Sequence, residues 1–76
     1  MPLGIYILKT VPGKEKEVQK KLLEEFEFDE AYVVTGQFDI IAKIFVPLTR
    51  RGFEELKERI AELEGVKEVK YLEAIV

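Results

Sequence analysis

Two apolar runs that meet at a glycine constrain this chain more than any other stretch. The segment Tyr32–Val46 reads YVVTGQFDIIAKIFV and is rich in β-branched and aromatic residues on both sides of Gly36. Glycine accepts the positive φ of a type II′ turn, so the sequence predicts a tight hairpin turning over Thr35–Phe38. In the second run, Phe38, Ile40, Ala42, Ile44 and Val46 line one face, and Asp39, Ile41, Lys43 and Phe45 line the other. Both faces of this strand are largely apolar, so both need a cover.

The remaining chain supplies two amphipathic helices and two further alternating strands. Val11-Pro12-Gly13 ends the first strand, because proline lacks a ladder donor and glycine favours a turn. Thr49 is a plausible N-cap, and Gly65 is expected at the C′ position of the second helix. The expected strands are Leu3–Lys9, Ala31–Thr35, Phe38–Val46 and Val66–Val76; the expected helices run from Lys14 to a closing Phe28-Asp29-Glu30 segment and from Thr49 to Gly65.

This βαββαβ order predicts one α+β domain, residues 1–76, with a ferredoxin-like plait. Such a fold is a four-stranded antiparallel sheet with two helices on one face. A chain of 76 residues buries only about 60% of its unfolded surface, so association is expected to add stability. The uncovered face would carry an apolar patch larger than monomers usually expose, formed by Ile41, Phe45, Tyr71 and Ile75 or by their neighbours. The sequence therefore predicts a homodimer formed through the sheet, without deciding which face the helices cover.

Composition removes several classes of function. The chain has no Cys or His, and it also lacks Ser, so it offers no thiolate or imidazole ligand and no serine or cysteine nucleophile. We therefore expect no catalytic residue, no metal site and no cofactor. A net charge of -3 argues against direct nucleic-acid binding. No stretch approaches the roughly 20 apolar residues of a membrane span, and no signal peptide is evident, so a cytoplasmic protein is expected. Its abundance of Glu and Lys hints at a thermophile.

Few polar residues are placed where they could bind a ligand. Asp39, beside the turn, can accept hydrogen bonds from backbone N–H groups or bind a ligand ammonium. The simpler interpretation is that it pins the hairpin or pairs with a lysine. Arg50 and Arg51, in the first turn of the second helix, could hold a carboxylate or phosphate, although such pairs are more often solvated or make a salt bridge between subunits. Tyr6 and Tyr71 are expected in the core or in an interface.

At the hairpin the sequence resembles a known family. The stretch VVTGQFDIIAKI is similar to the Gly-x-Tyr/Phe-Asp hairpin of the Lrp/AsnC ligand-binding domain, also called the RAM domain. An amphipathic helix follows, and then LEGVKEVKYLEAIV resembles the family's closing Leu-x-Gly-Val segment and last strand. The resemblance covers essentially the whole chain. Because the family's helix-turn-helix domain is missing from this sequence, the chain resembles the stand-alone RAM modules.

This resemblance implies an assembly and a ligand. Family members dimerise through their sheets, and the dimers assemble further into octamers or similar rings. Amino-acid effectors bind between dimers near the hairpin, which would place Gly36, Gln37, Phe38 and Asp39 at the site. The family's last-strand threonines fall at Val69 and Tyr71 here, which puts the effector's identity in doubt. The resemblance also suggests co-assembly with a full-length Lrp/AsnC regulator.

Two other classes of function share the predicted fold. One is a small enzyme of the dimeric α/β-barrel type, which the absence of His disfavours. The other is a structural assembly module that binds no ligand.

Overall fold

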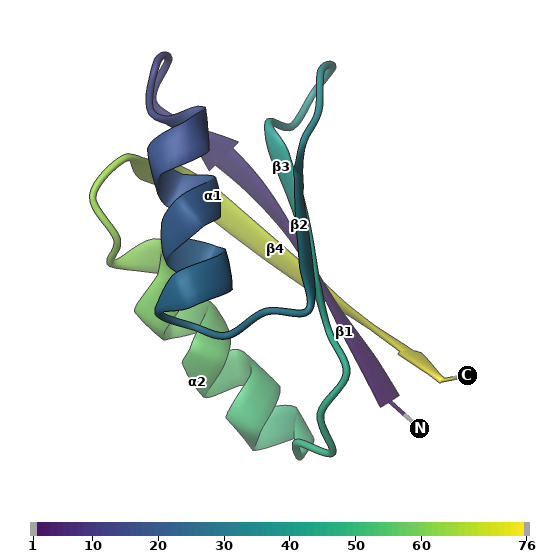
Figure 1. Cartoon of the computed structure of the whole chain (residues 1–76). Coiled ribbons are helices and arrows are strands. Elements are labelled where there is room, and N and C mark those ends of the chain that lie inside the picture. The colour runs from purple at the N-terminus through teal and green to yellow at the C-terminus, as the bar shows by residue number, and fades with distance from the viewer. Residues whose placement is uncertain (1, 76) are drawn as a thin grey trace.

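The computed structural model describes residues 2–75 and has the predicted plait (Figure 1). The elements are β1 (Pro2–Thr10), α1 (Glu15–Glu24), β2 (Glu30–Val33), β3 (Ile40–Ile44), α2 (Arg50–Ala61) and β4 (Val66–Ile75). All neighbouring strands are antiparallel, in the order β2-β3-β1-β4. Figure 1 shows both helices on the same side of the sheet, as the sequence predicted. Within residues 2–75, neither helix has the length and apolar character needed to cross a membrane.

The register of the central strand β1 decides which residues face the helices. Tyr6 is paired with Ala42 of β3 and with Tyr71 of β4, so these three side chains share one face. Tyr6 and Ala42 are fully buried. The helices therefore cover the face that carries the even-numbered residues of β1 and β3 and the odd-numbered residues of β4.

Aromatic rings join α2 to the sheet at the centre of this core. Tyr71 is stacked on both Tyr6 and Phe53, with ring centroids 5.5 and 5.7 Å apart, and Phe28 meets Tyr6 edge-on at 5.4 Å. The Tyr6 hydroxyl donates a 2.8 Å hydrogen bond to the Phe53 carbonyl, so the buried phenol is not left unpaired. Burial raises the pKa of Tyr6, and the neighbouring Tyr71 and Glu54 raise it further.

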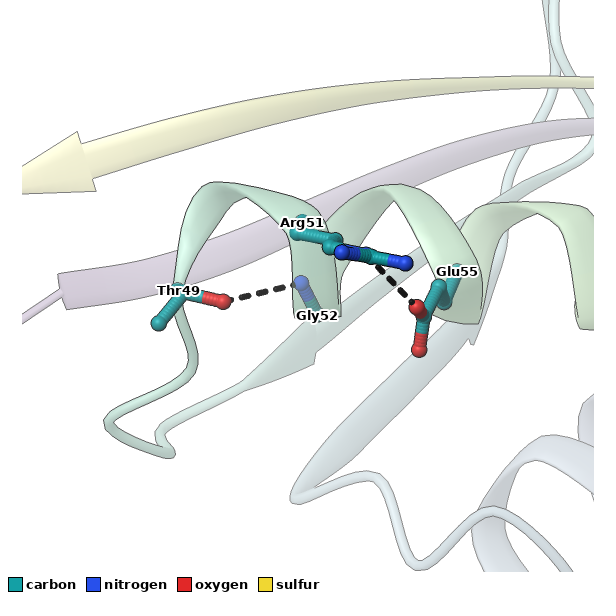
Figure 2. Close-up of polar contacts among 4 residues, drawn as sticks. All are labelled: Thr49, Arg51, Gly52 and Glu55. Carbon is teal, nitrogen blue, oxygen red and sulfur yellow. Dashed lines mark hydrogen bonds and ion pairs between the residues drawn. The ribbon is translucent and has the colours of Figure 1, made fainter.

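The helix ends agree in part with the sequence-based boundaries. Thr49 is the N-cap of α2, as predicted: its hydroxyl accepts a 3.1 Å bond from the Gly52 N–H (Figure 2). Gly65 is not at C′, because α2 ends at Ala61 with Glu62 as its C-cap. Gly65 lies in the turn into β4, where it has a φ of +95° and its carbonyl accepts a bond from the Val11 N–H.

Helix α1 is shorter than predicted. It ends at Glu24, and the chain then turns back on itself, since the N–H groups of Phe26 and Phe28 bond to the carbonyls of Lys21 and Leu22. This turn needs a positive φ of 56° at Glu27. The turn places Phe28 on the helix-covered face of the sheet, against Tyr6, where its side chain is almost fully buried. Phe26 and Phe28, which the helical pattern placed at the end of α1, therefore pack against the core from the loop that follows the helix.

The predicted two-residue hairpin turn is wrong in length. β2 ends at Val33 and β3 begins at Ile40, so a six-residue loop over residues 34–39 joins them. A bond from the Val34 N–H to the Asp39 carbonyl closes this loop. The predicted positive φ of Gly36 is confirmed, at +115°. We call residues 34–39 the β2–β3 loop.

Candidate functional site

The sheet face opposite the helices is apolar in the middle. We call it the open face. Pairing register assigns to it Leu3, Ile5, Ile7, Tyr32, Ile41, Leu72 and Ala74. Leu72 and Tyr32 remain 55% and 50% exposed, whereas their paired neighbours Ile5 and Ile41 are half-buried. Ile41 thus lies where the sequence analysis expected an uncovered apolar residue, and Phe45 follows β3 as an exposed side chain.

Charged residues of both signs border this apolar area. Glu30 of β2 is paired with Lys43 of β3 at one border, and Lys9 of β1 is paired with Glu68 of β4 at another. The Lys70 ammonium lies 3.8 Å from a Glu68 carboxylate oxygen. The open face therefore has an apolar centre with a mixed-charge rim, the usual anatomy of a protein interface.

Two of the four residues predicted for the dimer interface do not lie on the open face. Tyr71 faces the helices, because β1–β4 pairing puts it beside the buried Tyr6 and its ring stacks on Phe53. Ile75 lies four residues further along β4 than Tyr71 and has the same orientation, although at the strand end it is 84% exposed. Leu72 and Ala74 are the β4 residues that share a face with Ile41. The predicted alternation was correct, but its assignment to the two faces was wrong in β4.

Asp39 fastens the β2–β3 loop to the end of β1. Its carboxylate accepts a 2.8 Å bond from the Thr10 N–H, and its own N–H donates a 2.9 Å bond to the Leu8 carbonyl. The residue therefore has the structural role that was the simpler interpretation of the sequence. Thr10 is 4% exposed, and its hydroxyl has no hydrogen-bond partner within residues 2–75.

Phe38 does not continue the core-facing row of Ile40 and Ala42, as the sequence pattern suggested. Its ring centroid lies 5.5 Å from the Lys9 ammonium and 5.5 Å from the Lys70 ammonium. Both lysines belong to the open face by register, since Lys70 is paired with Ile7. The alternation fails at Phe38 because the chain leaves the sheet at Asp39. Sequence analysis missed this cluster, since Lys9 and Lys70 lie far from Phe38 along the chain.

The residues that the family resemblance assigned to an effector site fall into two groups. Gly36, Gln37, Phe38 and Asp39 lie together in the β2–β3 loop, and a Cβ at Gly36 would meet no atom within 4 Å. Val69 and Tyr71 instead face the helices, and Val69 is buried against the core. Phe38 contacts the intervening residue, Lys70, on the opposite face. Within one chain, the structure does not bring Val69 and Tyr71 to the loop.

The two arginines at the start of α2 have different surroundings. Arg51 makes a 3.2 Å ion pair with Glu55 one turn along the helix (Figure 2). Arg50 lies close enough to Tyr71 to affect its ionisation. Burial raises the pKa of the Tyr71 hydroxyl, Glu73 and Glu54 add to that, and Arg50 opposes it.

Comparisons with known proteins agree on one family. The chain is 32% identical to a hypothetical protein of Pyrococcus horikoshii, PHS023, with a TM-score of 0.83, and covers 92% of that structure. It is also 32% identical to FFRP-DM1, again with a TM-score of 0.83, and covers all of it. Escherichia coli AsnC has the same fold, with a TM-score of 0.82 at 16% identity, and the chain spans 51% of it.

A curated relative gives the same result at the sequence level. The chain is 31% identical over 65 residues to an uncharacterized HTH-type transcriptional regulator of Pyrococcus furiosus, and it spans 44% of that protein's length. No protein-family profile matches the chain. The fold is that of the α+β domain of AsnC-type regulators. The chain belongs to the Lrp/AsnC family and corresponds to its RAM domain, which confirms the resemblance seen in the sequence.

Proposed function

We propose that this domain is a regulatory module of the Lrp/AsnC type that pairs with a second copy of itself through the open face. The observation that supports this most directly is the apolar centre of that face. The helices pack on the other side of the sheet and leave Leu72 and Tyr32 at least half exposed beside Ile5, Ile7 and Ile41. A contiguous apolar patch on a sheet favours burial against another apolar surface.

The rim of the open face favours a second copy as the partner. Because the rim carries Glu30 and Lys43 at one border and Lys9 with Glu68 at another, one copy can meet the other with opposite charges opposed. A face of one sign would repel its own copy. Self-pairing would also supply the additional buried area that a 76-residue chain lacks.

Solution mass tests the assembly. Sedimentation equilibrium over a wide protein concentration range should give a dimer or a multiple of a dimer, such as an octamer or a similar ring. A single 8.8 kDa species at every concentration would contradict the proposal. Repeating the measurement with each amino acid shows whether a ligand changes the assembly.

We further propose that the β2–β3 loop binds a small effector, an amino acid being the first candidate. One oxygen of the Asp39 carboxylate already accepts a bond from the Thr10 N–H, and the loop also offers backbone N–H donors. Within residues 2–75, the amides of Gly36 and Gln37 make no hydrogen bond, and no side chain covers Gly36. Such amides suit the carboxylate of an amino acid.

Thermal unfolding against the twenty amino acids tests the effector. A ligand at 100 times its dissociation constant should stabilise the folded domain by about 2.7 kcal/mol. That gain corresponds to a rise in Tm of roughly 10 °C or more for a domain of this size. A flat response across the panel would favour the alternative, an assembly module that binds no ligand, and would leave the pairing proposal intact.

Co-assembly with a full-length regulator is the third part of the proposal. The chain matches about half of AsnC and 44% of the Pyrococcus furiosus regulator, so those proteins carry a comparable domain within a longer chain. If the open faces of two such domains are similar, a mixed dimer can form. Native mass spectrometry of the domain mixed with a full-length relative should then show mixed oligomers. Only separate homo-oligomers would contradict this part.

A further inference from the structure

Phe38 connects the β2–β3 loop with the open face. The ring comes from the loop, yet its neighbours Lys9 and Lys70 are rim residues of the open face, each with its ammonium 5.5 Å from the ring centroid. Lys70 is held in turn by Glu68 at 3.8 Å. Phe38, Lys9, Lys70 and Glu68 therefore form one cluster, which we call the Phe38 cluster.

Within residues 2–75, the hydrogen bonds that tie the same loop to β1 lie at its base. The Asp39 carboxylate and N–H bond to Thr10 and Leu8, and the Val34 N–H bonds to the Asp39 carbonyl. The Phe38 ring adds a contact with Lys9 of β1 and Lys70 of β4, while Gly36 and Gln37 are exposed. The position of the loop tip thus depends on whether the Phe38 cluster is formed.

We propose that the Phe38 cluster is part of the surface that pairs with a second copy, so that pairing fixes the β2–β3 loop. This inference rests on the proposed pairing through the open face. The attraction between an ammonium and an aromatic ring strengthens when water is excluded. A second copy that covers the rim excludes water from Lys9 and Lys70, which tightens their contact with Phe38. The loop is then ordered in the dimer and looser in the monomer.

Ligand binding at the loop is linked to pairing by the same cluster. A ligand that needs the ordered loop binds the dimer more tightly than the monomer, and by reciprocity it tightens the dimer. The Phe38 cluster is thus a conformational link between the two proposed functions of the domain.

Three variants test the assignment of Phe38 to the pairing surface. Phe38→Ala removes the ring and should raise the dimer dissociation constant about five-fold or more, whereas Phe38→Tyr keeps the ring and should stay close to the original chain. Phe26→Ala is the matched control, because the Phe26 ring also has a cationic neighbour, Arg59 at 5.2 Å, but packs against the core on the helix side. Sedimentation equilibrium on folded samples gives all the constants.

Amide hydrogen exchange tests the loop without any substitution. Above the dimer dissociation constant, the Val34 and Asp39 amides should exchange at least about three-fold more slowly than below it. Equal exchange in the two states would overturn the link. A dimer unaffected by Phe38→Ala, or weakened equally by Phe26→Ala, would also overturn it. These failures concern the Phe38 cluster, whereas a chain that never dimerises contradicts the proposed function itself.

Discussion

Two aspartates, Asp39 and Asp29, make the same kind of bond in different surroundings. Each accepts a hydrogen bond from a backbone N–H at a strand end: Asp39 from Thr10 at 2.8 Å and Asp29 from Phe45 at 2.7 Å. The Thr10 bond is partly buried and the Phe45 bond is exposed. An amide that loses its partner can be rehydrated at the exposed site but much less readily at Thr10.

We therefore expect Asp39→Ala to lower the free energy of unfolding by about 1–3 kcal/mol, and Asp29→Ala by about 1 kcal/mol or less. Urea unfolding of the two variants measures both changes. Asp39→Asn keeps an oxygen acceptor and should recover part of the loss. Equal costs for the two alanine variants would show that burial of Thr10 does not decide the strength of the bond.

Tyr6 should make the domain sensitive to alkaline pH. Its pKa in the folded state is raised above the ordinary value of about 10, chiefly by burial. The folded domain therefore keeps the proton at a pH where the unfolded chain releases it. This contribution to stability is complete below about pH 10 and is lost as the pH rises above that value, with a slope of up to about 1.4 kcal/mol per pH unit.

Tyr6→Phe removes the ionisable group and its bond to the Phe53 carbonyl. At neutral pH the variant should be less stable by about 1 kcal/mol, and above pH 10 its stability should fall less steeply than that of the original chain. Urea unfolding at several pH values between 7 and 11 gives both quantities. Tyr32→Phe is the comparison variant. The pKa of the Tyr32 hydroxyl is also raised, chiefly by its hydrogen bond with Glu30, but this bond is exposed, so removing it should change the pH dependence of stability less than Tyr6→Phe does. If the free energy of unfolding of Tyr6→Phe and that of the original chain fall with pH at the same slope, ionisation of Tyr6 does not cause the alkaline loss of stability.

The start of α2 depends on one side chain. Thr49 caps the helix through its hydroxyl, while the first turn contains no acidic residue and has Arg50 and Arg51 instead. Cations in this turn oppose the helix dipole, so the cap has little electrostatic support. Thr49→Ala should cost about 1 kcal/mol in urea unfolding. Thr49→Ser, which keeps the hydroxyl, should cost much less; a similar loss in both variants would assign the effect to the threonine methyl group.

Most features of the helices and strands were predicted correctly from the sequence. Period-two and helical spacing were sufficient to predict all six elements and their order, and capping chemistry predicted Thr49. Positive φ was predicted correctly for Gly36, but the length of its loop was not, because glycine tolerates positive φ in many turns. The orientation of β4 needed the β1–β4 register. Both of its faces are partly apolar, so no local pattern distinguishes Leu72 from Tyr71.

The candidate site was predicted less well than the fold, since it depends on contacts between distant segments. The Asp39–Thr10 bond spans 29 residues, and the Phe38 cluster joins residues from β1, the β2–β3 loop and β4. Nothing in the local sequence around Phe38 indicates that its ring leaves the core-facing row. Such contacts follow from the register of the sheet, which spacing along the chain does not specify.

At the scale of the whole molecule, the proposed pairing makes stability depend on protein concentration. If dimers bury the open face and unfolded chains do not associate, mass action raises Tm as the concentration rises. The strand β4 offers a matched pair of tests, since Leu72 and Ile75 are both exposed but lie on opposite faces. Leu72→Lys should lower Tm at high concentration and abolish its concentration dependence. Ile75→Lys should leave that dependence intact. Calorimetry over a hundred-fold concentration range measures this dependence in both variants. If both variants lose the concentration dependence of Tm, or if neither does, the open face is not the pairing surface.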